Sequence, residues 1–332
     1  MTMLHDRRPA AVALSPILSA RYRARDLERI ALAWPDGPLV MVGADGRAEG
    51  PLDDVEILLA GALPPEHLER VVARAPGLRW IHSAAASVDR VLAAARSRPS
   101  IVITNARGVF SVPVAEYVVM MALAVSRRLP QLLELQRERT WQPLEGRELS
   151  TMTVGVVGLG SLGGAIVRSL IALGSRVVAT RRDPDAAEQI PGVEVLGGPE
   201  ALPALLAASD IVVLAVPLTP ETEGLLGADE LAAMRPDAWV ISVARPRVVD
   251  EQALLRALRE GRIGGAVLDA FRDGPLPPGS PFWDLDNVIV TPNTSWSTDR
   301  VLDRSIALFC ENLERYRRGE PLLNLVDPAI GY

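Results

Sequence analysis

The chain has 332 residues, of which 48% are apolar and only 4% aromatic, and it is long enough to bury two hydrophobic cores. Its formal net charge is −6 with no block of like charge, which excludes an extended basic surface for nucleic acid or an anionic membrane. All 35 basic side chains are arginine, because the sequence contains no lysine, and chemistry that needs a lysine amine is therefore excluded.

Cysteine and histidine are too few for a disulfide framework or a metal centre. Cys310 is the single cysteine, and the spacings of His5, His67 and His82 are unlike those of a zinc site. No apolar stretch approaches the roughly 18 residues that are needed to span a bilayer. We therefore expect a cytoplasmic protein with no bound metal.

Short β-rich runs alternate with helical patterns over the first third of the chain. The runs are AVALS, PLVMVG, VEILLAG, LRWIHSA and IVITN, with helical patterns such as EHLERVVARA between them. This alternation predicts parallel βαβ units in a first α/β domain that ends near Ala106. The next segment, VPVAEYVVMMALAVSRRLPQLLELQRER, is apolar around most of a helix and is expected to pack on another domain or subunit, which favours a homodimer.

A second βα series begins at TVGVVGLG and predicts a second parallel sheet. It continues through RVVATRR, IVVLAVPL, AWVISVAR, GGAVLDAF and NVIVTPN. The last pattern, DRVLDRSIALFCENLERYRRG, predicts a long amphipathic helix that packs back on the first domain. The expected domains are therefore 1–106 with 299–332, which is discontinuous, and 107–298.

The segment GLGSLG lies between a predicted strand and a predicted helix. Gly158 allows a tight turn, Gly160 lets the backbone approach a pyrophosphate, and Gly163 lets the helix pack closely on the strand. Ser161 and Leu162 open the helix, whose free N–H groups face the phosphates. This context predicts a Rossmann domain that binds a dinucleotide.

The end of the next predicted strand indicates which dinucleotide is preferred. An acidic residue normally binds the ribose hydroxyls there, but this strand ends in Arg181 and Arg182, with Asp183 beyond. Guanidinium groups pair with a 2′-phosphate, so we expect a preference for NADP(H). NAD(H) remains the alternative, with both arginines solvated and Asp183 on the ribose.

Longer segments resemble the D-isomer-specific 2-hydroxyacid dehydrogenase family across nearly the whole chain. They are SAAASVDRV, VITNARGVFSVPVAEYVV, GRELSTMTVGVVGLGSLG, AVPLTPETEGLL, VARPRVVDEQALLRALREGRIGGAVLDAF and PLPPGSPFWDLDNVIVTPN. The resemblance implies a flavodoxin-like substrate domain that faces a Rossmann cofactor domain across a cleft, and usually a dimer. It also implies hydride transfer between the cofactor and a small 2-keto or 2-hydroxy acid.

The resemblance assigns roles to individual residues of the second domain. Arg245 matches the arginine that holds the substrate carboxylate and carbonyl, and a bidentate guanidinium suits a planar carboxylate. Asp269 matches the acid that accepts a hydrogen bond from the nicotinamide amide. Further matches to the loops around the cofactor are Val216, Pro217, Thr219, Thr222 and Val243.

In the first domain, the resemblance points to the loop from Ala84 to Val88. It matches a loop whose backbone N–H groups bind the substrate carboxylate, with Ala85, Ala86 and Ser87 as the binding residues. Ser87 stands where the family usually has glycine.

The sequence departs from the family where protons are transferred. The family's catalytic histidine is replaced by Asn293, and the carboxylate that supports it is replaced by Gly274. An amide cannot donate a titratable proton near neutral pH, although it can hydrogen-bond a developing oxyanion. Pro246 replaces the glycine after the substrate arginine, and Trp296 replaces a small residue and is expected to form a flat wall of the pocket.

His82 is a candidate for the missing proton donor, because it ends the run LRWIH just before the carboxylate loop. The alternative is a histidine partly buried beside Trp80. Two functions follow for the whole chain. One is an NAD(P)H-dependent oxidoreductase that acts on a small carboxylate, either a 2-keto acid or an imino or otherwise activated analogue. The other is a catalytically silent dinucleotide-binding sensor or scaffold.

Overall fold

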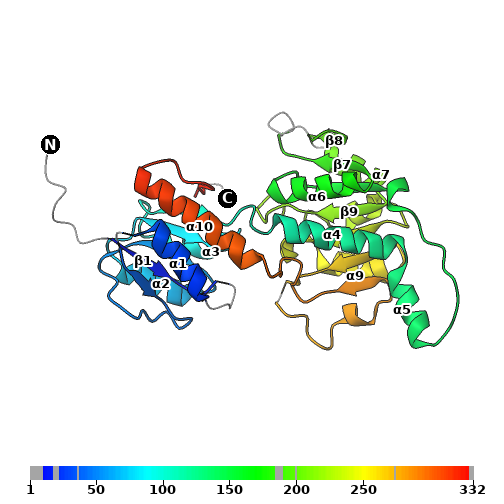
Figure 1. Ribbon diagram of the computed structural model, residues 1–332. Coiled ribbons are helices and arrows are strands. Elements are labelled where there is room, and N and C mark those ends of the chain that lie inside the picture. Colours follow the sequence, from blue (N-terminus) through cyan, green and yellow to red (C-terminus); the bar gives the residue numbers. More distant parts are fainter. Residues whose placement is uncertain are drawn as a thin grey trace. The chain divides into compact units, whose positions relative to one another are not determined.

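The computed structural model describes residues 10–17, 22–35, 37–183, 190–198, 200–272 and 274–328. The chain divides into two compact units, which consist of residues 1–110 with 298–332 (unit 1) and of residues 111–297 (unit 2). Figure 1 shows that each unit is an α/β structure built on its own sheet. Both sheets are parallel throughout, and the predicted fold class is confirmed. His5 lies outside the described residues.

Unit 1 contains a five-stranded parallel sheet with the order β2-β1-β3-β4-β5. This order is that of a flavodoxin-like sheet. Its strands match the five apolar runs of the sequence: β1 (Ala11–Leu14), β2 (Leu39–Met41), β3 (Val55–Ala60), β4 (Trp80–Ser83) and β5 (Val102–Asn105).

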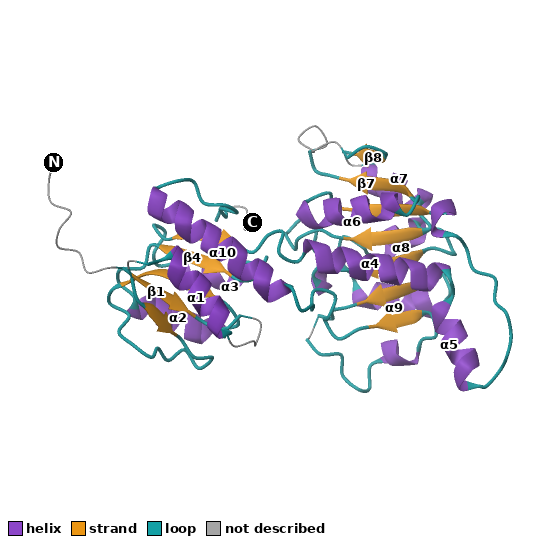
Figure 2. Ribbon diagram, in the orientation of Figure 1, coloured by secondary structure: helices purple, strands orange, loops and turns teal. Residues whose placement is uncertain are grey.

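Helices cover both faces of this sheet (Figure 2). One face packs on α2 (Pro65–Arg74) and α3 (Asp89–Ala95), and the other on α1 (Ala24–Ala33) and the C-terminal α10 (Val301–Arg318). Ile306, Phe309 and Leu313 of α10 are completely buried, and their spacing places them on one face of the helix. The amphipathic helix near the end of the chain therefore packs on the first sheet.

Unit 2 contains a seven-stranded parallel sheet with the order β12-β11-β10-β9-β6-β7-β8. Six of these strands have the Rossmann arrangement, and β12 extends it. The sequence did not predict β8, a short edge strand that is only partly buried. The strands are β6 (Thr153–Val157), β7 (Arg176–Thr180), β8 (Val193–Leu196), β9 (Ile211–Leu214), β10 (Trp239–Ser242), β11 (Gly265–Leu268) and β12 (Val288–Val290).

The predicted helix after the first domain is two helices in the structure, α4 (Ser111–Ser126) and α5 (Leu129–Arg137). The chain turns at Arg128, which has a left-handed φ of 57°, and Pro130 lies in the first turn of α5. Buried residues of α4 pack in one core with α6, whereas α5 contains no buried residue.

Of the remaining helical elements of unit 2, η1 (Leu149–Thr151) precedes β6, and the others follow one strand and precede another along the chain. These others are α6 (Ser161–Ala172), α7 (Ala201–Ala208), α8 (Ala228–Ala233), η2 (Pro246–Val248), α9 (Glu251–Arg259) and η3 (Pro281–Asp284). Among the described residues, no helix combines the length and the apolar character that a membrane span requires.

Candidate active site

The sequence-predicted residues of unit 2 follow the carboxyl ends of its strands. Because the strands are parallel, the loops after them lie along one edge of the sheet. The strand order changes direction between β6 and β9, and ligands bind at such a switch point in open α/β sheets. The loops along this edge begin at Gly158, Arg181, Ala215, Val243, Asp269 and Thr291.

The loop after β6 has the geometry of a phosphate cradle. Gly158 has a φ of +99°, a conformation that favours glycine. A Cβ on Gly163 would lie 1.9 Å from the Gly158 carbonyl oxygen, so the start of α6 packs directly on the turn. A Cβ on Gly160, by contrast, would meet nothing within 4 Å. The loop therefore leaves open space at its middle glycine, beside the first N–H groups of α6, and these residues fit a dinucleotide pyrophosphate.

Arg181 and Arg182 lie next to this cradle, because β7 pairs with β6 and the Gly158 N–H donates to the Thr180 carbonyl. The partly buried Arg181 donates from Nη1 to the Leu159 carbonyl oxygen at 3.4 Å. Arg182 is exposed. The guanidinium groups thus follow the strand where a ribose 2′-substituent is recognised in Rossmann folds.

The loop after β9 is held by its own hydroxyl groups. Val216 packs against Gly158, since a Cβ on that glycine would lie 2.7 Å from Val216 Cγ1. Thr222 Oγ1 accepts from the Thr219 N–H at 2.8 Å and donates to the Pro217 carbonyl at 2.6 Å. Thr222 therefore shapes the loop, and its predicted contact with the cofactor stays a prediction, as do those of Val216, Pro217, Thr219 and Val243.

Arg247 lies within η2 and Arg245 is its N-cap, and the two side chains differ in their partners. Arg247 forms an ion pair with Glu223, at 2.5 Å from Nη2 and 3.1 Å from Nε. Arg245, at the N-cap, is exposed, and its side chain makes no hydrogen bond or ion pair with any residue that the structure describes. Arg245 therefore presents a guanidinium group with all of its donors available to an anion.

Asp269 organises the loop after β12. Its carboxylate is 3% exposed, and Oδ1 accepts from Thr291 Oγ1 at 2.6 Å and from the Thr294 N–H at 2.8 Å. Oδ2 accepts from the Ser295 N–H at 3.0 Å. The family resemblance implies a nicotinamide contact for Asp269, which stays a prediction, and the contacts that the structure describes bind this carboxylate to the loop.

Tyr117 of α4 extends this network and was not expected from the sequence. Its hydroxyl lies 2.6 Å from Thr291 Oγ1, and burial raises the pKa of Tyr117 to about 12. Because Thr291 donates its proton to Asp269, the Tyr117 hydroxyl is the donor to Thr291. The only sequence signal was a tyrosine within an otherwise aliphatic helix.

Asn293 and Trp296, which the sequence singled out separately, contact each other in this loop. Trp296 Nε1 donates to Asn293 Oδ1 at 3.3 Å, which leaves the Asn293 amide N–H groups as donors. Asn293 is exposed and has a left-handed φ of 52°, a conformation in which asparagine and histidine are both enriched. The loop thus presents an oriented neutral donor.

Gly274, which the family resemblance places at the position of the second acid, has a φ of +89° in a turn bridged to Phe271. A non-glycine residue would be strained there. Among the described residues, no group of three or more His, Cys, Asp or Glu side chains is placed to hold a metal ion.

In unit 1, the loop from Ala84 to Val88 turns its carbonyl groups toward protein donors. Ser83 Oγ lies within 3.3 Å of the Ala85 and Ser87 carbonyl oxygens, and Asn105 Nδ2 donates to the Ala86 carbonyl at 2.9 Å. No described residue accepts a hydrogen bond from the N–H groups of Ala86, Ser87 and Val88. This arrangement fits the predicted backbone nest for an anion.

His82 is placed differently from the expectation of a proton donor. It is completely buried in β4, and its ring packs beside Phe309, with centroids 5.5 Å apart, and near Trp80. Nδ1 lies 2.8 Å from Thr104 Oγ1, and burial lowers the pKa of His82 to about 3. A neutral imidazole enclosed in the core cannot protonate a substrate near neutral pH, so the proton-donor hypothesis is corrected.

The comparisons with known proteins agree with this fold. The NAD binding domain of the D-isomer specific 2-hydroxyacid dehydrogenases matches residues 119–295. The chain therefore belongs to this family of NAD(P)-dependent oxidoreductases, and the predicted family membership is confirmed.

Three similar proteins show how far the likeness extends. A D-isomer specific 2-hydroxyacid dehydrogenase from Xanthobacter autotrophicus Py2, solved with NADPH and MES, is 36% identical with a TM-score of 0.84, over 98% of this chain and 100% of that one. The NADPH-dependent glyoxylate/hydroxypyruvate reductase of Sinorhizobium meliloti, solved with NADP and sulfate, is 28% identical with a TM-score of 0.83, over 97% and 100%. A glyoxylate reductase of Thermofilum pendens is 35% identical over 78% of each chain.

Proposed function

We propose that the protein reduces a small 2-oxo carboxylate, or its imino analogue, with NADPH. The observation that carries this proposal is the unpaired guanidinium of Arg245 on the sheet edge that also holds the glycine cradle. A planar carboxylate accepts two parallel hydrogen bonds from such a group. The names of the relatives, which include glyoxylate and hydroxypyruvate reductases, support the substrate class.

The preference for NADPH over NADH rests on Arg181 and Arg182. Both follow β7, next to the cradle, and Arg182 is exposed. Each charge-assisted hydrogen bond to a 2′-phosphate contributes about 1.5–3 kcal/mol. The complexes of two relatives with NADPH and NADP support this preference. Titration of the wild type and of Arg182→Ala with both cofactors tests it, and tighter NADH binding by the wild type contradicts it.

The chemistry divides between the cofactor and the chain. When bound, the nicotinamide supplies a hydride to the substrate carbon. Arg245 holds the carboxylate, and the Asn293 amide donates a hydrogen bond to the substrate oxygen as negative charge develops there. The proton that completes the alcohol comes from water, because Asn293 has none to give. An iminium substrate carries its proton already and is therefore less affected by the lost histidine.

Single-turnover oxidation of NADPH tests the function, with glyoxylate, hydroxypyruvate and a panel of cyclic and acyclic imino acids as substrates. Arg245→Ala is expected to lower kcat/KM by about 10²-fold or more, since two charge-assisted bonds are lost. Arg247→Ala is the matched control, because its guanidinium already pairs with Glu223. Tight NADPH binding without turnover on any substrate overturns the proposal in favour of a dinucleotide sensor.

We also propose that the protein is a homodimer that buries the outer faces of α4 and α5. Large apolar side chains are exposed along both helices and the segment that follows them: Val112, Met120, Leu123, Leu129, Leu132, Leu133 and Trp141. An apolar surface of this kind marks an interaction site. Light scattering of Leu132→Glu/Leu133→Glu tests it, with a monomer expected; a wild-type monomer contradicts it. The cytoplasmic location stays a prediction.

A further inference from the structure

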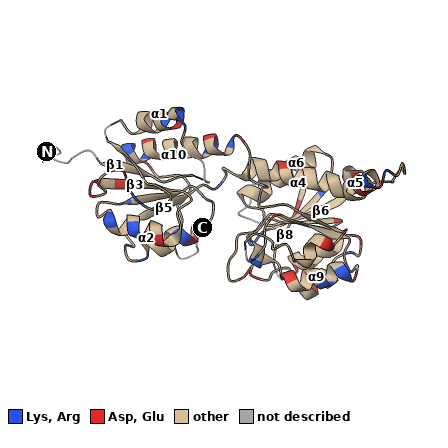
Figure 3. Ribbon diagram, turned by 90° about the horizontal axis from the view of Figure 1, so that it is seen from below, with Lys and Arg blue, Asp and Glu red and all other residues tan. Residues whose placement is uncertain are grey.

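A groove of about 540 Å³ lies between α1 and the start of α10 in unit 1. We define the arginine groove by the four arginines that line it, Arg25, Arg29, Arg300 and Arg304. Figure 3 marks basic residues on both helices. We propose that the arginine groove binds the phosphate group of a small molecule, at a site separate from the cofactor loops of unit 2.

The charge balance of the groove is opposite to that of the chain. Four guanidinium groups face a single lining carboxylate, Asp303, although the whole protein has a net charge of −6. A concentration of positive charge on an acidic protein raises the local concentration of small anions. The arginine groove is too small to bind along a nucleic-acid backbone, which requires an extended basic surface.

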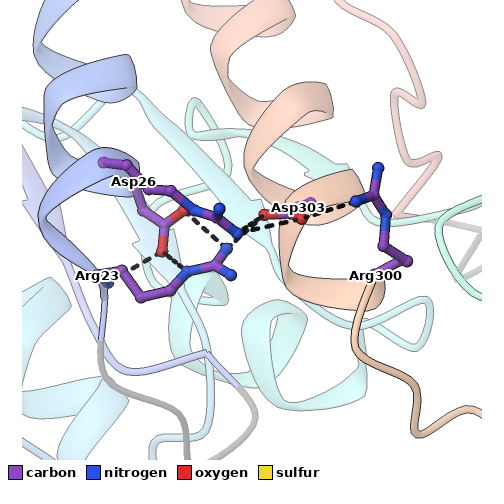
Figure 4. A network of polar contacts seen from close by, with 5 residues as sticks. Arg23, Asp26, Arg300 and Asp303 are labelled. Carbon is purple, nitrogen blue, oxygen red and sulfur yellow. Dashed lines mark hydrogen bonds and ion pairs between the residues drawn. The ribbon is translucent and has the colours of Figure 1, made fainter.

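Asp303 satisfies only part of this positive charge. Figure 4 shows its carboxylate between Arg23 and Arg300. Arg25 donates to Asp303 Oδ1 at 3.2 Å, and Arg300 lies at 3.9 Å from Oδ2. Arg23 also binds the buried Asp26, at 2.8 Å from Nε to Oδ2. Arg23 therefore bridges Asp26 and Asp303, and the Asp303 carboxylate is shared among Arg23, Arg25 and Arg300.

Two of the four arginines, Arg29 and Arg304, form no ion pair with any described residue. Arg29 is exposed and makes no hydrogen bond or ion pair with any described residue. Arg304 Nη1 is buried and has no hydrogen-bond partner among the residues that the structure describes. A buried charged donor without an acceptor is unfavourable, and an anion in the groove supplies the acceptor that Arg304 lacks.

The chemistry of the groove favours a phosphate group over a monocarboxylate. A phosphate monoester carries nearly two negative charges and three acceptor oxygens, which several guanidinium forks can share. Arginine presents planar paired donors that fit these oxygens. The N-terminal end of α10, which no side chain caps, adds a favourable dipole for an anion.

Inorganic phosphate is the probe for this site, measured by calorimetry on the full-length protein saturated with NADP⁺, which blocks the cofactor loops. Phosphate is expected to bind the wild type, and Arg29→Ala is expected to weaken binding by about 10-fold, the effect of one charge-assisted contact. Arg304→Met, which keeps the apolar stem, is expected to weaken it similarly. Arg74→Ala, on α2 and outside the groove, is the matched control.

Asp303→Asn distinguishes the proposal from a merely structural role of these arginines. Removing the Asp303 carboxylate frees Arg25 and Arg300 from their competing partner. Phosphate is therefore expected to bind to Asp303→Asn several-fold more tightly than to the wild type. Three results would each overturn the proposal. The first is that the wild type binds no phosphate, the second that Arg29→Ala binds it with the affinity of the wild type, and the third that Asp303→Asn binds it no more tightly than the wild type. None of these results depends on turnover, so the site can fail while the proposed oxidoreductase function holds.

Discussion

The loop after β12 in unit 2 and the loop after β4 in unit 1 offer hydrogen-bond donors in opposite ways. After β12, backbone N–H groups are bound by the Asp269 carboxylate, and a side-chain amide, that of Asn293, is left to donate. After β4, side chains of Ser83 and Asn105 bind the backbone carbonyl groups, and the backbone N–H groups are left.

This difference shows which substitutions can alter each region. A side-chain donor is removed by replacing one residue, whereas a backbone donor persists whatever side chain stands there. A serine at position 87, where the resemblance expects glycine, is therefore compatible with the predicted anion nest, since the nest consists of main-chain groups. Asn293, in contrast, carries its chemistry in its own side chain.

The largest expected difference in activity is between variants that remove the side chain of Asn293 in one loop and of Ser87 in the other. Asn293→Gly, which tolerates the left-handed backbone, is expected to lower kcat by about 10²–10³-fold, as measured for loss of an oxyanion donor. Ser87→Ala is expected to change kcat/KM by no more than about twofold, because Ser87 Oγ makes no hydrogen bond with the described residues. Equal losses in the two variants contradict the comparison.

The next largest effect concerns the support of the Asn293 loop. Asp269→Asn places an amide NH₂ against backbone donors and is expected to lower the free energy of unfolding by about 2–3 kcal/mol. Chemical denaturation measures it. Asp250→Asn is the matched control, because Asp250 accepts from two backbone N–H groups as the N-cap of α9, where asparagine serves equally well. A similar small effect in both variants refutes the organising role of Asp269.

His82, which is buried in unit 1, is expected to make the free energy of unfolding depend on pH, without a comparable effect on kcat. The folded-state pKa of His82, about 3, lies below the ordinary value of 6.5, so the unfolded chain binds a proton first as the pH falls. The free energy of unfolding is therefore expected to fall by up to about 1.4 kcal/mol per pH unit below 6.5, until the pH approaches 3. The stability lost between pH 7 and pH 5 is expected to be smaller in His82→Gln.

His82→Gln also separates fold from catalysis. It is expected to retain kcat within a few-fold, since the side chain is enclosed beside Phe309. A loss of 10²-fold or more with an intact fold restores the proton-donor hypothesis, because that is the size of a general-acid effect.

Periodicity and motif predicted most of the fold, because the fully buried parallel strands read as unbroken apolar runs. These sequence patterns did not predict β8, a partly exposed edge strand of only four residues with a weak apolar pattern. They also did not predict the break at Arg128, where a local turn interrupts an otherwise helical pattern. For His82 the sequence left two interpretations open, because a strand residue can face the core as easily as a ligand, and the structure buries the side chain near Trp80. The contacts of Asp269 and Trp296 depend on loop geometry, which no sequence spacing specifies.

The smallest expected effect tests how Asn293 is oriented. Trp296→Phe keeps an aromatic ring but removes the indole N–H that binds Asn293 Oδ1, so the amide is no longer held with its donors outward. The loss of one hydrogen bond of about 1 kcal/mol predicts a decrease in kcat of about fivefold with little change in KM. Trp283→Phe is the matched control, because its N–H donates at 2.9 Å to the Pro277 carbonyl, outside this loop.

A double-variant cycle decides whether Trp296 acts through Asn293. If it does, Trp296→Phe has little further effect on kcat once Asn293→Gly has removed the amide, and the two losses are not additive. Additive losses instead assign Trp296 an independent role as a wall of the pocket. In that case the Asn293 amide is oriented by its left-handed backbone alone, and the side-chain donor after β12 is as much a product of main-chain geometry as the N–H groups after β4.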